Sequence, residues 1–239
     1  MQQIYLDNAA TTPVRPEVEE VMQPYFCEKY GNPSGIYKMA SECRQALETV
    51  RKQIGETLKV SAEEIYFTSG GTESDNWAIK STAQRLKEKG KHIITSKIEH
   101  HAVLNSCAYL ETQGFEVTYL DVDEWGCVRF DALQRAIRKD TILISIMYAN
   151  NEVGTIQPIE QIGKIAKDIF FHTDAVQAYG QIPIDVRREN IHLLSASAHK
   201  FNGPKGVGFL YIDKRVPVMS YIHGGKQERN HRAGTENVA

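Results

Sequence analysis

The sequence is poor in cysteine, with four among its 239 residues, at positions 27, 43, 107 and 127. None of the four forms a Cys-x-x-Cys pair or another zinc-ligand spacing, so neither a zinc site nor a disulfide framework is expected. Four reduced, packed cysteines are typical of a cytoplasmic protein.

Long apolar runs and an excess of one charge are also missing. No apolar stretch approaches the ~20 residues that a membrane span needs, and Met1–Asp7 lacks the basic and apolar segments of a secretory leader. The formal net charge is −2, which offers no electrostatic argument for nucleic acid or an anionic membrane. We therefore expect a cytoplasmic protein that binds neither nucleic acid nor membranes.

What is present is an ordinary globular composition, 41% hydrophobic and 24% charged, in which short β-branched runs alternate with helical patterns. This alternation predicts an α/β fold, a mostly parallel sheet with helices on both faces. The predicted strands are 65–68, 92–96, 116–120, 141–149, 169–173, 191–196 and 207–212. The predicted helices are 16–30 (disturbed by Pro24), 38–59, 73–89, 101–113, 130–138 and 159–167.

One strand of the sheet should run against the others. The link between strands 191–196 and 207–212 holds no helical pattern and is short for a parallel crossover, so these two strands should be antiparallel. A second short link, from Lys167 to Ile169, is unusual between a helix and a strand. It could shorten the helix or shift the strand that follows.

Ligands of parallel sheets bind at the carboxyl ends of the strands, so the residues that follow each strand are the candidates for a binding site. The turn Ser69-Gly70-Gly71-Thr72 leads directly into a helix, which suits either a phosphate or a plain strand–helix turn. His100 opens the next helix, where it either stacks on a planar cofactor and moves protons or simply caps the helix.

Three further strand ends carry polar residues with two interpretations each. Asn151 suits a turn before Gly154 or a hydrogen bond to a ligand oxygen. Asp174 either caps the following segment or pairs with a protonated ring nitrogen. Lys200 either extends from its turn into solvent or, desolvated, is an amine that forms a Schiff base. A phosphate cradle, a stacking histidine, an aspartate and an amine together fit pyridoxal 5′-phosphate.

Seven blocks of sequence resemble the cysteine desulfurases of the NifS/IscS group, within the class V aminotransferase family. The resemblance covers the whole chain, with the motifs in the family's order and at similar spacings. The blocks are Tyr5–Thr12, Thr68–Ser74, Glu99-His100, Asn150–Gly154, His172–Gln177, Ala198–Lys200 and Arg232–Asn237.

The resemblance implies a fold of type I, as in aspartate aminotransferase, and a role for each matched residue. Lys200 would hold pyridoxal phosphate covalently and move protons, His100 would stack on the ring, Asp174 would pair with its nitrogen, and Gln177 would contact its phenolic oxygen. Asn151 would lie beside cofactor and substrate. The phosphate would be held by Gly71, Thr72, Ser197 and His199, with Thr235 reaching in from the other subunit of a homodimer.

The implied reaction converts L-cysteine to L-alanine and passes the sulfur to an enzyme cysteine as a persulfide, for iron–sulfur cluster assembly or thiolation. An iron–sulfur scaffold or another sulfur acceptor would be the protein partner. In the family the nucleophilic cysteine follows the Arg-x-Gly-Thr block, whereas all four cysteines here precede it. We therefore expect a truncated chain, residues 1–15 belonging to the small domain or the active-site edge and 16–239 forming an incomplete large domain, without desulfurase turnover.

Two other functions remain open from the sequence. One is a class V aminotransferase or lyase that needs Lys200 and His100 but no cysteine nucleophile. The other is a degenerate, non-catalytic fragment that dimerises or binds a partner.

Overall fold

A seven-stranded sheet in the order β1-β7-β6-β5-β4-β2-β3 forms the centre of the computed structural model, which describes residues 4–239. Residues 1–3 of the predicted segment 1–15 lie outside the described residues. The strands are β1 (Ile65–Thr68), β2 (His92–Ser96), β3 (Glu116–Leu120), β4 (Thr141–Ser145), β5 (Phe170–Asp174), β6 (Leu193–Ser197) and β7 (Gly208–Ile212). Strand β7 is antiparallel to both β1 and β6, while all other pairings are parallel. The predicted sheet is confirmed, including its antiparallel strand.

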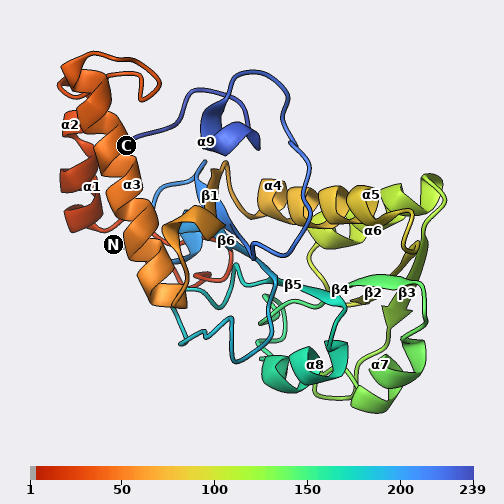
Figure 1. Cartoon of the computed structure of the whole chain (residues 1–239). Coiled ribbons are helices and arrows are strands. Elements are labelled where there is room, and N and C mark those ends of the chain that lie inside the picture. Colours follow the sequence, from red (N-terminus) through yellow and green to blue (C-terminus); the bar gives the residue numbers. More distant parts are fainter. Residues whose placement is uncertain (1–3) are drawn as a thin grey trace.

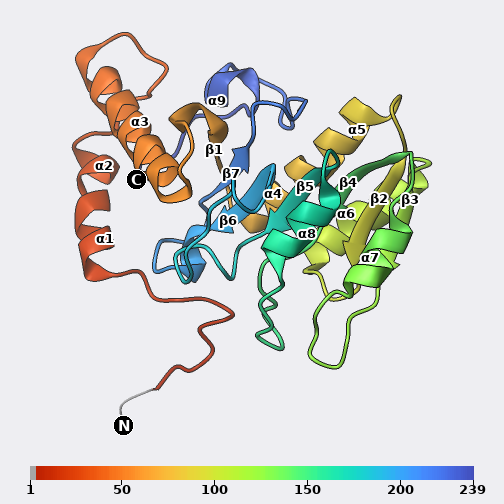
Figure 2. The same cartoon turned by 60° about the horizontal axis from the view of Figure 1, so that its bottom comes forward.

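Helices cover both faces of this sheet, as the alternating sequence pattern predicts (Figure 1). One face carries α4 (Gly71–Asn76), α5 (Thr82–Leu86) and α6 (His101–Thr112), and the other carries α7 (Phe130–Ala136) and α8 (Ile159–Ala166). Helices α1 (Pro16–Met22), α2 (Pro24–Cys27) and α3 (Lys38–Leu58) lie beyond the β1 edge (Figures 1 and 2). None of the helices in residues 4–239 is long and apolar enough to span a membrane.

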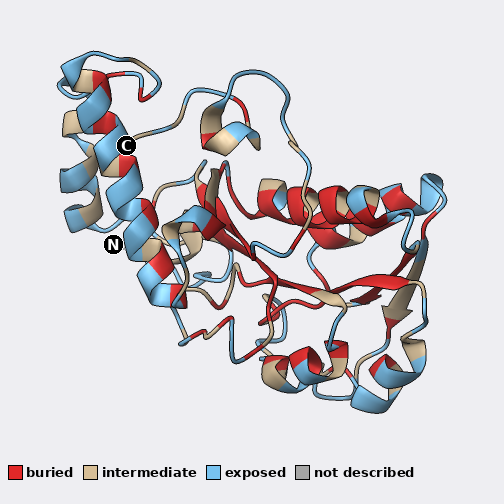
Figure 3. Cartoon of the chain, in the orientation of Figure 1, coloured by how far each residue is buried: buried red, intermediate tan, exposed pale blue. Residues whose placement is uncertain are grey.

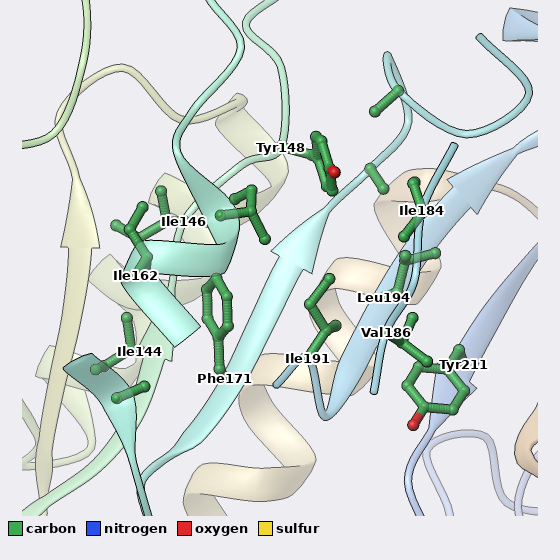
Figure 4. Close-up of a cluster of buried hydrophobic side chains, with 14 of the residues drawn as sticks. Ile144, Ile146, Tyr148, Ile162, Phe171, Ile184, Val186, Ile191, Leu194 and Tyr211 are labelled. Carbon is green, nitrogen blue, oxygen red and sulfur yellow. The ribbon is translucent and has the colours of Figure 1, made fainter. Parts of the chain in front are cut away.

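The two faces of the sheet bury separate apolar clusters because successive strand residues point in opposite directions. Ile93, Leu143 and Leu193 pack under α4–α6, with Trp77 and Val103. Ile94 of the adjacent strand position belongs to the cluster on the other face. Figure 4 shows part of that cluster, in which Ile144, Phe171 and Leu194 of the strands lie with Ile162 of α8. The strands are accordingly buried along most of their length, and the helices are buried on the side that faces them (Figure 3).

The predicted helix 73–89 differs from the structure in its start and its continuity. It begins at Gly71, because the Gly70 carbonyl already accepts a hydrogen bond from the Ser74 N–H at 3.1 Å. A π-helical turn, η2 (Trp77–Ser81), then separates α4 from α5. Such a turn adds a residue within an otherwise α-helical segment, a change that apolar periodicity does not reveal.

The predicted strand 141–149 was too long, since β4 ends at Ser145. Beyond that point the chain stays hydrogen-bonded to β5, where Ile146 N donates to His172 O and Tyr148 N to Asp174 O. It loses its other neighbour because β2 stops at Ser96. The apolar run therefore continues past the end of the strand.

The short link before β5 leaves the register of the sheet intact. Helix α8 ends at Ala166, Lys167 takes a positive φ of 49°, and Asn190 Nδ2 donates to the carbonyls of Gly163 and Lys167, both at 3.0 Å. Strand β5 pairs in parallel with β6, and Asp174 lies opposite Ser195. The short link is thus accommodated by one residue with positive φ and by the hydrogen bonds of the Asn190 side chain.

A buried ion pair fastens the last helix, α9 (Gln227–Asn230), to the β1 side of the sheet. Glu228 accepts two bonds from the Arg51 guanidinium of α3, at 2.8 and 2.9 Å, and one from Phe67 N at 3.0 Å. Glu228, Arg229 and Asn230 all have positive φ, a conformation that non-glycine residues adopt only at a cost. The ion pair holds this strained turn in place.

We predict that Glu228→Ala destabilises the protein by roughly 3–5 kcal/mol, because it leaves the buried Arg51 charge with only the exposed Glu48 as a carboxylate partner. The free energy of unfolding from urea titration tests this. Glu63→Ala, which removes the exposed partner of Lys214, is the matched control and should change stability little. Equal effects of the two variants would contradict the assigned role.

Candidate active site

A cavity of about 690 Å³ opens at the carboxyl ends of β1, β5 and β6, closed on one side by the N-terminal segment. Nine of the ten predicted site residues line it: Gly71, Thr72, His100, Asn151, Asp174, Gln177, Ser197, His199 and Lys200. The tenth, Thr235, is exposed and lies outside this cavity. Its assignment to a partner subunit remains a prediction.

Close backbone approach shapes the glycine turn at the end of β1. Gly70 has a φ of 144°, which only glycine adopts readily, and it lies against β7. A Cβ on Gly208 would stand 2.3 Å from Ala196 O and 2.7 Å from Gly70 Cα. The turn, β6 and β7 are therefore in direct contact, and the first N–H groups of α4 point out of this junction without helical acceptors.

Lys200 and the N-terminal segment meet on the other side of the cavity. The half-buried Lys200 Nζ donates to the carbonyls of Ala9 and Ala10, the latter at 3.0 Å. Gln177 Nε2 also donates to Ala9 O, at 2.9 Å. Burial lowers the pKa of Lys200, while Asp174 acts in the opposite direction. The result is an amine that loses its proton more readily than a solvated lysine.

His199 anchors the same segment through its ring and its backbone. Its Nδ1 pairs with Thr11 Oγ1 at 3.1 Å, and its carbonyl accepts from both the N–H and the hydroxyl of Thr12 at 2.8 Å. Burial, together with Lys200 and Lys205, lowers the pKa of His199. The ring therefore reaches the cavity as a neutral donor or acceptor near neutral pH.

His100 and Asn151 each have a local structural role and also line the cavity, so both interpretations of their sequence positions apply. His100 caps α6, since its Nδ1 accepts from Ala102 N at 3.1 Å, and its exposed ring also lines the cavity. Asn151 lies in a turn, donates to Glu152 Oε1 at 2.9 Å and lines the cavity as well.

Asp174 ends β5 with 5% of its surface exposed, and its Oδ1 accepts from Val176 N at 2.9 Å. Burial raises the pKa of this carboxyl, against the effects of the Val176 N–H, His100 and Lys200. No lysine or arginine within residues 4–239 forms an ion pair with it. A buried carboxyl that lacks a cationic partner suits a cationic ligand group.

Sequence reasoning missed two buried carboxyl groups beside Asp174. Asp75 belongs to a helical series of buried positions in α4 and η2, namely 71, 74, 75, 78 and 79. This i, i+3, i+4 periodicity could have revealed from the sequence that Asp75 is buried. Glu99 precedes α6, and its Oε1 accepts from Ser96 Oγ at 2.6 Å and Met147 N at 3.0 Å. Burial raises the pKa of Glu99 to about 8.

Comparison with known proteins agrees with this arrangement. The family profile described as "Aminotransferase class-V" matches residues 4–239. The chain belongs to the aminotransferase class-V family. Its fold is therefore the type I fold of this class, as predicted.

Curated and solved relatives of this class V chain are similar over its whole length. It is 62% identical to "Cysteine desulfurase IscS" of Methanosarcina thermophila, over 98% of this chain and 59% of the relative. It is 60% identical to the protein of that name from Dictyoglomus turgidum, over 100% of this chain and 61% of the relative. The chain thus spans about three-fifths of these relatives.

Two solved structures share the fold closely. A "NifS-like protein" superposes with a TM-score of 0.97 at 46% identity, over 99% of this chain and 66% of that one. The structure titled "SspA in complex with cysteine" superposes with a TM-score of 0.96 at 44% identity, over 99% of this chain and 69% of that one.

We predict that Lys200 of this class V chain reacts with formaldehyde and cyanoborohydride at lower pH than a model lysine peptide, because its lowered pKa leaves more free amine. Asp174→Asn should shift the profile further down, since Asp174 favours the ammonium form. Peptide mass spectrometry across a pH series measures the labelling. A Lys200 profile identical to that of the peptide would contradict the prediction.

Proposed function

We propose that this chain binds pyridoxal 5′-phosphate and forms the cofactor-binding part of a cysteine desulfurase. The observation that carries the proposal is the convergence of an amine, a buried carboxyl and a glycine turn on one cavity. Lys200, Asp174 and Gly71 come from different strand ends, yet all line it.

The residues present suit the chemical groups of this cofactor. An aldehyde needs an amine that deprotonates easily, which the pKa shift of Lys200 supports. A ring nitrogen needs a carboxylate without another cation, which fits Asp174. A phosphate needs free N–H groups without side-chain bulk, which fits the glycine turn beside Ser197.

Each cavity residue would then have one task. Gly71, Thr72, Ser197 and His199 would hold the phosphate, and Gln177 the phenolic oxygen. Asp174 would hold the ring nitrogen, His100 would stack on the ring, and Asn151 would orient the substrate carboxylate. Thr235 would complete the phosphate site of a partner subunit in a homodimer.

When bound, pyridoxal phosphate supplies an electron sink that stabilises negative charge on the substrate's α-carbon. Lys200 would hold it covalently through Nζ, and the neutral amine, when released, would accept a proton from that carbon. The carbonyls of Ala9 and Ala10 would orient Nζ, and the N-terminal segment would exclude water from that side.

L-cysteine as the substrate, and sulfur transfer as the activity, rest on the relatives. The curated relatives are named cysteine desulfurases, and one solved relative is titled as a complex with cysteine. L-alanine would be the other product, and an iron–sulfur scaffold or another sulfur acceptor would be the partner.

The positions of the cysteines favour a second candidate function. Cys43 and Cys107 are buried, and none of the four cysteines lines the cavity. A class V aminotransferase or lyase reaction needs Lys200 and His100 but no thiol nucleophile. Residues 1–239 by themselves would then support cofactor chemistry without a persulfide.

For the cofactor, we predict that borohydride fixes one pyridoxyl group per chain, on Lys200, after incubation with pyridoxal phosphate. Lys200→Ala should abolish this label, since Lys205, which also lines the cavity, makes none of the contacts with Ala9 and Ala10 that orient the Lys200 amine. Intact and peptide mass spectrometry provide the measurement, and Lys97→Ala, at an exposed ion pair, is the control. Undiminished labelling of Lys200→Ala would contradict the site.

For the sulfur step, we predict that the 239-residue chain loaded with cofactor forms no persulfide from L-cysteine. The physical reason is distance, because none of its cysteines lines the cavity. Alkylation and mass spectrometry of Cys27, Cys43, Cys107 and Cys127 measure this. A persulfide on any of them would refute the prediction, whereas alanine release with the sulfur passed to an added small-molecule thiol would favour the lyase reaction.

A further inference from the structure

Two buried carboxyl groups, Asp75 and Asp174, line the cavity, and a third, Glu99, is buried close enough to repel both. Asp75 of α4 is 1% exposed, and Glu99 and Asp174 are each 5% exposed. Among residues 4–239, no lysine or arginine pairs with any of them. Burying several carboxylates without a cation is unfavourable, so such a group must retain protons at neutral pH.

Asp75 is the least compensated of the three. Its Oδ1 is fully buried and has no hydrogen-bond partner within the described chain. The nearest ring nitrogen, His172 Nε2, is 3.6 Å away and already pairs with Ser195 Oγ at 3.0 Å. The other ring nitrogen of His172 pairs with Ser145 Oγ at 2.8 Å.

His172 therefore does not supply a positive charge. Its ring is completely buried, and this burial lowers its pKa to about 3, so the ring is neutral at physiological pH. Burial, followed by the repulsion of Asp174, raises the pKa of Asp75 well above its usual range; the Ser195 hydroxyl acts against this rise, and Glu99 adds to it.

Asp174 differs from Asp75 in what surrounds it. It accepts the Val176 N–H, and His100 and Lys200, which line the cavity, both act to lower its pKa. Oxygen atoms of Asp75 and Asp174 lie within 4.8 Å of each other and of a His100 ring nitrogen. Two negative charges this close are not both stable in a buried site. The charge is more stable on Asp174, which has the Val176 N–H and Lys200 beside it.

We propose that Asp75 is a positioning residue: a buried neutral acid behind Asp174 that confines the pair's single negative charge to the cavity side. The arrangement presents one anion to a cationic ring nitrogen instead of two repelling ones. The nature of that ligand rests on the proposed function, whereas the protonation of Asp75 is a property of the protein alone.

The first test uses the cofactor-free protein. Unfolded Asp75 ionises near pH 3.9, whereas folded Asp75 keeps its proton. Above that pH, folding therefore binds a proton, and the free energy of unfolding falls as the pH rises. Asp75→Asn, a neutral isostere, removes this pH-dependent loss of stability. The folding constant of Asp75→Asn relative to the unaltered protein should rise by up to about tenfold per pH unit from pH 5 to 7.

Urea titrations at several pH values measure that ratio. A ratio that stays constant or falls with pH overturns the proposal, because a merely structural role of Asp75 would not create this slope. If the variant does not fold, carboxyl ¹³C NMR of the unaltered protein decides. A buried aspartic acid protonated at pH 7 is expected, and its absence refutes the proposal.

The second test adds pyridoxal phosphate in equilibrium dialysis. Asp75→Asn should retain affinity because it mimics the protonated acid, Asp75→Ala should weaken it, and Asp174→Asn should lose at least about tenfold, or 1.4 kcal/mol. Weak binding by Asp75→Asn equal to that of Asp174→Asn refutes the proposal. If no form binds the cofactor, the proposed function fails, while the pH result still judges Asp75.

Discussion

The antiparallel strand β7 is the constraint on which the site depends. It lies between β1 and β6 and pairs with both, so the ends of those two strands are separated by one strand only. The absence of a side chain at Gly208 lets Gly70 approach β7 closely. The glycine turn after β1 and the His199-Lys200 turn after β6 are thereby brought to one cavity.

The chemistry at that edge is arranged by burial rather than by ion pairs. The Lys200 amine remains on the cavity side, whereas the buried carboxyl groups of Asp75 and Asp174 lie in α4 and at the end of β5, respectively. Elsewhere the chain pairs its buried charges, as in Arg51 with Glu228 and Arg232 with Glu73. An uncompensated cluster at one edge is the distribution expected of a site that receives a cationic ligand group.

The N-terminal segment is part of this site although it belongs to no strand or helix. Ala9 O accepts hydrogen bonds from both Lys200 and Gln177, and Thr11 and Thr12 bind His199. These contacts join residues 168 to 191 positions apart. They orient the amine while the segment covers it.

The sequence by itself determined the alternation of strands and helices, the antiparallel strand and nine of the residues that line the cavity. The alternation, the antiparallel strand and the polar residues at the strand ends follow from local physics: apolar periodicity, glycine turns and the rule that parallel strands end at one edge. The places of Gln177, Ser197 and His199 come instead from the resemblance of their motifs to a known family. Tertiary structure alone decided the end of β4, the π-helical turn in the helix after β1, and the burial of Asp75 beside Asp174. Each of these depends on which segments lie next to one another in space. The protonation of a carboxyl group and the length of a strand are set by residues that are distant in the sequence.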